Sequence, residues 1–179
     1  MATETIFADG TFSGTGWTGT GGDIDEGISA ADGNEISSDS DGEGDVLTID
    51  FADVVTIVDA DTVTDIEIVT RGRVTNDGGD ESFQIDLLVS GSPINAVLGP
   101  ILTNTHTTGN HSNAAWDADK TVTQLNSMQV TLDPGQSGMP TPNTWHLDTA
   151  EIVITFTPSS SGPSIPLLHH YYHNTLGVR

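Results

Sequence analysis

Residues 82–89 read SFQIDLLV, and their order of apolar and polar side chains is the clearest structural signal in the sequence. The apolar residues on one face recur at every second position: Phe83, Ile85, Leu87 and Val89. A period of two is typical of a β-strand, because successive side chains of a strand point to opposite faces. We therefore expect a strand with one face in a hydrophobic core.

The same pattern occurs in other parts of the chain. Residues 46–51 (VLTIDF) and 150–158 (AEIVITFTP) alternate in the same way, and residues 63–74 (VTDIEIVTRGRV) are rich in β-branched side chains. Segments rich in Gly, Asp, Asn and Pro separate these runs, as turns do. The sequence thus predicts an all-β fold, an antiparallel β-sandwich of jelly-roll-like form.

One segment has the spacing of a helix. In residues 117–128 (DADKTVTQLNSM), Val122, Leu125 and Met128 lie three apart after Asp119, a candidate N-cap. We expect a short helix that covers one end of the sandwich. A Ser/Pro/Gly-rich stretch then ends the body near Pro158, so the predicted organisation is a β-sandwich domain over residues 1–158 and a linker with a C-terminal arm over residues 159–179.

Composition limits the function. The chain has 179 residues, no cysteine, and 26 acidic against 4 basic residues, for a formal charge of -22. Thiol chemistry is excluded, and direct binding to nucleic acid or to anionic lipid is disfavoured by charge repulsion. The first residues, MATETIFADG, do not resemble a signal peptide, and no run approaches about 20 apolar residues, so we expect synthesis in the cytoplasm without membrane insertion.

An acidic loop suggests calcium. Four acidic residues occupy alternate positions in DSDGEGD: Asp39, Asp41, Glu43 and Asp45. An EF-hand would place a bidentate Glu at loop position 12, where this chain has Asp50 inside a predicted strand. A looser calcium loop and a plain acidic hairpin both remain open; we expect no required cofactor, and calcium is the ion that this loop could bind.

The sequence gives little support for catalysis. Five carboxylates occur within residues 23–35, namely Asp23, Asp25, Glu26, Asp32 and Glu35. A glycosidase pair would need one of them to be desolvated and held at a set distance from another, which sequence does not establish. GxSxG and P-loop patterns are absent. We therefore predict that the protein is not an enzyme.

Tryptophans are candidates for a ligand site. Trp17, Trp116 and Trp145 could stack on sugar rings if they are exposed on one face of the sandwich, or they could seal its ends as core residues. Both interpretations remain open at this point.

The C-terminal arm, PSIPLLHHYYHNTLGVR, differs from the acidic body. We expect it to dock onto a neighbouring subunit through Leu167, Leu168, His169, His170, Tyr171, Tyr172, His173 and Arg179. His169 and His173 lie four apart and could instead contribute two ligands to zinc or nickel on a helix.

Several motifs in order resemble a known group of proteins. They are GW at residues 16–17, IDEG at 24–27, ADGNEISS at 31–38, FAD at 51–53, TDIEIVTRGR at 64–73, IDLLVSG at 85–91 and EIVITFTP at 151–158. This order, over roughly residues 12–158, resembles small β-sandwich virion proteins of tailed bacteriophages, especially marine ones. The segment HTTGNHSNAAW at 106–116 keeps only part of the family's pattern before a tryptophan.

The resemblance implies a non-enzymatic virion component, above all a capsid decoration or cement protein. Such a protein would form a homo-oligomer, for example a trimer, and would bind the major capsid protein or other virion subunits. Arg71 and Arg73 would then pair with acidic groups across a subunit boundary, although pairing within one subunit is equally compatible with the sequence. Two alternatives remain: a carbohydrate- or receptor-binding module of a phage tail or fibre, and a calcium-dependent adhesive or filament subunit.

Overall fold

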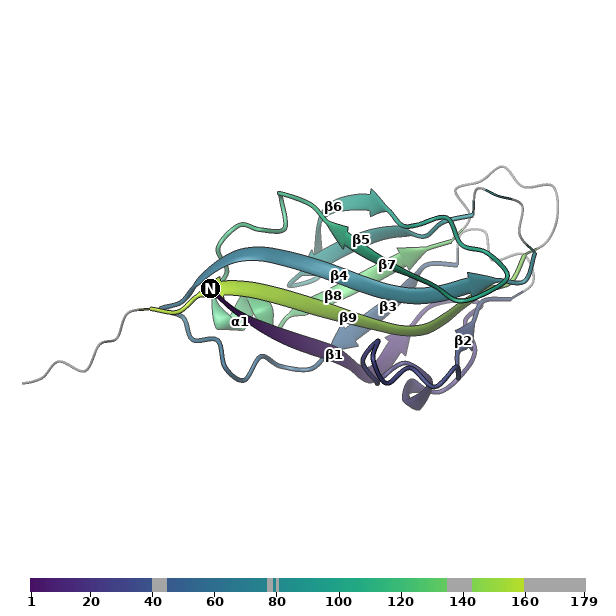
Figure 1. Ribbon diagram of the computed structural model, residues 1–179, viewed down its shortest axis with the longest axis horizontal. Helices are drawn as coiled ribbons and strands as arrows, with labels where there is room; N and C mark the ends of the chain where they lie inside the picture. The colour runs from purple at the N-terminus through teal and green to yellow at the C-terminus, as the bar shows by residue number, and fades with distance from the viewer. Residues whose placement is uncertain (40–44, 77–78, 80, 135–142, 160–179) are drawn as a thin grey trace, which may run out of the picture.

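The computed structural model describes residues 1–39, 45–76, 79, 81–134 and 143–159, which form a β-sandwich elongated along its strands (Figure 1). The strands are β1 (Ala2–Ser13), β2 (Ile36–Ser37), β3 (Leu47–Phe51), β4 (Thr62–Val74), β5 (Gln84–Val89), β6 (Ser92–Leu98), β7 (Thr107–Ser112), β8 (Met128–Asp133) and β9 (Trp145–Thr157). A 3-10 helix, η1 (Gly21–Asp23), and a short α-helix, α1 (Val122–Leu125), complete the described elements.

The strands form two layers that share β1. Hydrogen bonding runs in the order β6-β5-β8-β3-β1-β9-β4-β7, with β2 paired to β9, and every pair is antiparallel. The first half of β1 pairs with β9 and the second half pairs with β3, so the sheet folds over at this strand. The predicted all-β, jelly-roll-like sandwich is confirmed.

Alternation of side chains explains how the layers pack. In β3, Leu47 and Ile49 are fully buried whereas Thr48 and Asp50 are only partly so, and in β5 the buried pair is Ile85 and Leu87. Each strand thus contributes one apolar face to a single core between the layers, and burial of this apolar area is the main stabilising term of such a fold. The strands predicted from residues 46–51, 63–74, 82–89 and 150–158 are all present.

The three tryptophans belong to this core. Trp17, Trp116 and Trp145 are 7%, 0% and 3% exposed. The Phe83 ring lies between two of them, with ring centroids 6.5 Å from Trp17 and 5.4 Å from Trp145. The structure therefore places these rings inside the sandwich and not on a sugar-binding face, because their large apolar area fills space that smaller side chains would leave empty.

The short helix is present, but it begins later than the sequence indicated. Its N-cap is Thr121, whose side chain accepts a hydrogen bond from the Gln124 amide, and Gln124 completes a capping box. Asp119, the expected cap, instead accepts a hydrogen bond from the Val63 amide at 3.2 Å and ties this loop to β4. Leu125 is buried, so the helix does cover part of the core.

Residues 160–179, which include every residue of the predicted docking arm, lie outside the described residues. Among the residues that are described, no helix has the length and apolar character needed to span a bilayer.

Stability should depend on pH through His111. This side chain is 6% exposed, its Nε2 lies 3.1 Å from Thr70 Oγ1, and burial lowers its pKa to about 4. The unfolded chain binds this proton near pH 6.5, so stability is fully present above that pH and is lost as pH falls towards 4. We predict a loss of about 3 kcal/mol from this group over that interval.

Chemical denaturation of the native protein and of His111→Gln at several pH values tests this expectation. Gln can keep a polar atom near Thr70 but does not titrate, so its stability should fall less between pH 6.5 and 4. Identical pH profiles for the two proteins would show that His111 is not responsible.

Candidate functional site

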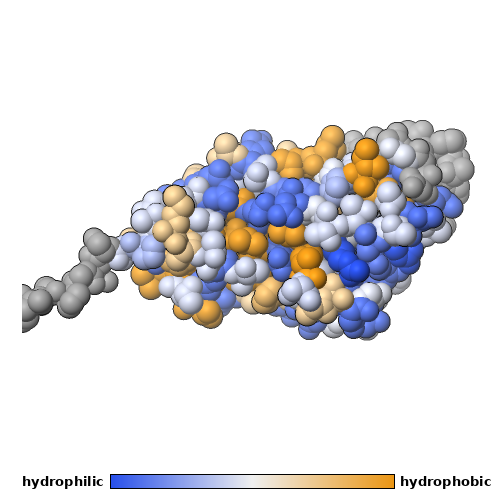
Figure 2. All heavy atoms as spheres, in the orientation of Figure 1, coloured by the Kyte–Doolittle hydropathy of each residue, from blue (hydrophilic) through white to orange (hydrophobic). Residues whose placement is uncertain are grey.

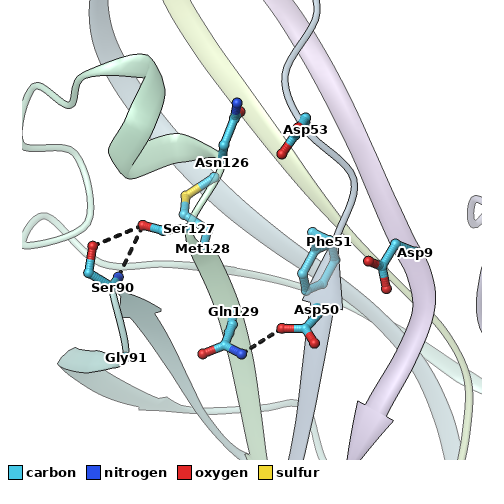
Figure 3. A pocket seen from close by; sticks show the side chains of 10 residues that line it. All are labelled: Asp9, Asp50, Phe51, Asp53, Ser90, Gly91, Asn126, Ser127, Met128 and Gln129. Atoms are coloured by element: carbon cyan, nitrogen blue, oxygen red, sulfur yellow. Dashed lines mark hydrogen bonds between the residues drawn. The ribbon is translucent and has the colours of Figure 1, made fainter.

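A groove of about 430 Å³ lies on the half of the sandwich formed by β1, β3 and β8 (Figure 3). Its lining comes from these strands, from the turn between β5 and β6, and from the segments that follow β3 and α1. The lining residues are Asp9, Asp50, Phe51, Asp53, Ser90, Gly91, Asn126, Ser127, Met128 and Gln129. This volume lies within the range of small-ligand sites, and most of the lining side chains are polar.

Asp50 and Gln129 form the centre of the groove. They are direct partners in the register of β3 and β8, and both lie on the face opposite the core residues. The Gln129 Nε2 donates a hydrogen bond to Asp50 Oδ1 at 2.5 Å (Figure 3). This cross-strand bond fixes the orientation of both side chains before any ligand arrives.

Several polar atoms of the groove have no partner within the described part of the chain. Asp50 Oδ2, Gln129 Oε1, both carboxylate oxygens of Asp53 and Asn126 Nδ2 make no hydrogen bond there. Four of these five atoms are acceptors and one is a donor. The groove can therefore accept hydrogen bonds from a ligand rich in hydroxyl groups.

Glu4 fixes the segment that carries Asp53. Its carboxylate, 8% exposed, accepts hydrogen bonds from the amides of Val55, Thr56 and Ile57 at 2.6–3.2 Å and from Thr56 Oγ1 at 2.6 Å. Burial by itself raises the pKa of Glu4, but these hydrogen bonds outweigh it and hold the pKa below its ordinary value. The Glu4 carboxylate therefore acts as a fixed clamp on this loop.

Asn126 holds the same loop from the other side. Its Oδ1 accepts a hydrogen bond from the Val54 amide at 3.0 Å, which joins the end of α1 to the segment after β3. Ser127, the next residue, bonds Ser90 at 3.1 Å across to the β5–β6 turn. The walls of the groove are thus linked to one another.

Sequence reasoning did not find this groove. Its residues come from four separate segments, and none of them forms a ligand-binding motif. Asp50 and Gln129 are outward positions of strands, which a period-two pattern predicts to be ordinary surface. Only the pairing of β3 with β8 brings them together.

A second polar cluster lies at the opposite end of the strands. Glu35 accepts hydrogen bonds from Arg73, whose Nε lies 3.0 Å away, and it lies 3.1 Å from His106 Nε2 and 2.8 Å from His146 Nδ1. Burial lowers the pKa of His146, against the attraction of Glu35. These contacts hold the segment before β2 against β4 and β9.

Three carboxylates of that end have the spacing of metal ligands. Among the described residues, Glu26, Asp32 and Asp148 bring one oxygen each to within 4.8 Å of one another. Oxygen ligands of this kind suit calcium, the cofactor that the sequence allowed, but these carboxylates are not those of the predicted calcium loop. The Arg71 guanidinium already forms an ion pair with Asp148, a fully buried side chain, and supplies positive charge to the cluster.

The other acidic candidates are only partly described. Asp41 and Glu43 of the predicted calcium loop lie outside the described residues. Burial, and then the nearby Asp39 carboxylate, raise the pKa of Asp45. Asp23 accepts hydrogen bonds from Thr20 in the cap of η1, and Asp25 is exposed.

No family model matches the chain, and no curated protein matches it. Several solved structures do. One titled "Carbohydrate-Binding Module CBM36 in complex with calcium and xylotriose" is 16% identical with a TM-score of 0.42, and the match covers 86% of this chain and 99% of that one.

Two more solved structures match the chain at similarly low sequence identity. The CBM36-1 domain of a multidomain xylanase from the hindgut metagenome of Trinervitermes trinervoides is 12% identical with a TM-score of 0.42, covering 86% of this chain and 97% of that one. The xylan-binding module CBM15 is 16% identical with a TM-score of 0.46 and the same coverages. The sequence identities are low in all three matches.

The main functional prediction from the sequence, a capsid decoration protein, is wrong. The matched structures reported above are carbohydrate-binding modules. In addition, Arg71 and Arg73, which that hypothesis assigned to a subunit boundary, pair with Asp148 and Glu35 inside the chain. The arginines are used to fix a surface segment of the same molecule, as the alternative interpretation held.

Glu35 should stabilise the segment before β2. We predict that Glu35→Gln lowers the free energy of unfolding by about 1–2 kcal/mol, because Arg73 and two histidines lose a partly buried anionic partner. Amide hydrogen exchange over residues 24–36 should become faster.

Asp25→Asn is the matched control for this change. It removes one negative charge from the same segment at an exposed side chain, and its stability should stay within about 0.5 kcal/mol of the native value. Equal effects of the two substitutions would show that net charge, and not the Glu35 contacts, stabilises the segment.

Proposed function

We propose that the protein is a non-catalytic carbohydrate-binding module whose ligand site is the groove around Asp50 and Gln129. The single observation that carries this proposal is a preformed groove with oriented polar side chains and several unused hydrogen-bonding atoms. The absence of catalytic motifs from the sequence supports the non-catalytic part of the proposal.

The chemistry of the groove suits a sugar. A carboxylate can accept hydrogen bonds from two neighbouring hydroxyl groups of one sugar ring, and amide groups can both accept and donate. Asp50 and Asp53 supply the carboxylates, while Gln129 and Asn126 supply the amides. The two bonds that orient Gln129 and the Asp53 loop reduce the entropy that a ligand would have to remove on binding.

Hydrogen bonds, and not ring stacking, would provide most of the contact. Phe51 and Met128 line the groove but are only 6% and 2% exposed, and the tryptophans lie in the core. A site without an exposed aromatic platform binds a single glycan segment weakly and gains specificity from the placement of its polar atoms.

Direct binding measurements test the proposal. Isothermal titration with xylotriose, cellotriose and mannotriose should reveal saturable binding to at least one of them; xylotriose is included because it is the sugar in one of the matched structures. We predict that Asp50→Asn weakens that binding about tenfold or more, since it replaces a charged acceptor by a neutral one, puts a donor in place of the second oxygen and weakens the bond with Gln129.

Glu67→Gln is the matched control, because Glu67 is a partly exposed acidic residue of β4, on the other layer of the sandwich. Its affinity should equal that of the native protein, and thermal denaturation should show that both variants are folded. Binding that survives unchanged in Asp50→Asn would place the site elsewhere, and no binding to any glycan would reject the function.

A further inference from the structure

The described basic side chains of this protein are all engaged away from the groove. The chain contains only four Lys and Arg residues. Arg71 pairs with Asp148 and Arg73 with Glu35, and the Lys120 Nζ donates to the carbonyl oxygens of Trp116 and Ala118. Arg179 lies outside the described residues.

The Lys120 side chain is largely buried and does not present its charge at the surface. The side chain is 8% exposed, and burial lowers its pKa in spite of the attraction of Asp117 and Asp119. It lies on the segment before α1 and stabilises the chain there by bonding carbonyl groups. It does not contribute a positive charge to any ligand surface.

The groove has the opposite character. Asp9, Asp50 and Asp53 bring three carboxylates to one cavity of about 430 Å³, and no basic residue is among its lining side chains. Part of this charge is already used within the chain, since Asp9 Oδ1 accepts a hydrogen bond from the Thr11 amide and Asp50 Oδ1 accepts one from Gln129. The outward oxygens of Asp50 and Asp53 face a ligand with no nearby cation.

We infer that the groove selects neutral glycan chains and rejects chains that carry a carboxylate or sulfate on a bound sugar. This inference rests on the proposed function and adds its substrate class. An anionic group in the groove would lose hydration and meet three like charges at short range, whereas a hydroxyl group would donate a hydrogen bond to the same oxygens.

The charge of the whole chain acts in the same direction. A formal charge of -22 creates a negative potential around the molecule, which slows the approach of polyanions and leaves neutral chains unaffected. The screening length is about 10 Å at 0.1 M salt, so both effects should weaken as salt is added. If electrostatic repulsion causes the selectivity, the ratio of neutral-glycan affinity to acidic-glycan affinity should therefore fall as salt is added.

A matched pair of ligands tests the inference. Xylotriose is compared with xylotriose that carries one glucuronic acid branch, by isothermal titration of the full chain at low salt and at about 0.5 M salt. A chelator is present in every titration, so that divalent ions cannot bridge two carboxylates. If another trisaccharide of the panel binds best, it is compared with a counterpart in which one sugar is oxidised to a uronic acid.

We expect the acidic ligand to bind about tenfold more weakly, or worse, at low salt, and the difference to shrink at high salt. Equal binding of both ligands, or preference for the acidic one, would overturn the inference while leaving the proposed function intact. Failure of both ligands and of the whole neutral panel would instead reject the proposed function.

Charge substitutions separate the groove from the rest of the molecule. Asp53 accepts no hydrogen bond in the described part of the chain, so Asp53→Asn removes a groove charge without removing an internal contact. The ratio of neutral to acidic affinity should fall about threefold. Asp25→Asn removes an exposed charge that does not line the groove and should leave the ratio unchanged; equal changes in both variants would mean that only net charge matters.

Discussion

The double role of β1 is the constraint on which the rest of the structure depends. The first half of β1 pairs with β9 in one layer and the second half pairs with β3 in the other, so the strand must bend where its partner changes. The register with β3 is irregular between Ala8 and Phe12, and Gly10 has a φ of +83°, a conformation that glycine adopts without strain. A Cβ on Gly21 would lie 1.7 Å from the Gly10 carbonyl oxygen, so η1 packs directly on this bend.

The position of β1 also determines the groove. Glu4 lies on the core-facing side of the strand, where its carboxylate reaches the amides of residues 55–57, and Asp9 lies on the outward side, where it lines the groove. One strand therefore supplies both a wall of the candidate site and the clamp that fixes the loop of Asp53.

Charged side chains differ between the two ends of the molecule. The groove holds acidic side chains, while both described arginines stabilise the far end of β4 and β9. The outer face of that layer is a mixture of hydrophilic residues and small hydrophobic islands (Figure 2).

The sequence predicts the central strands because their alternation is strong and local. Residues 82–89 form β5 with the expected face in the core, and residues 46–51 form β3 in the same way. It did not identify β1, although Glu4, Ile6 and Ala8 alternate there, because a buried glutamate breaks the apolar pattern. The cap of α1 was misplaced by two residues because Asp119 and Thr121 are both good N-cap residues, and tertiary contacts decide between them. The groove could not be predicted, since it depends on which strands become neighbours.

The most direct test of the groove as the ligand site is an amide chemical-shift map of the isotope-labelled protein titrated with the neutral trisaccharide that binds best. We expect the largest shifts on residues 50–54, 90–91 and 126–129, which line the groove or are bonded to its walls. Shifts concentrated instead on residues 26–35, 71–73 and 146–148 would place the ligand at the charged cluster of the opposite end. That result would show that the groove around Asp50 and Gln129 is not the ligand site.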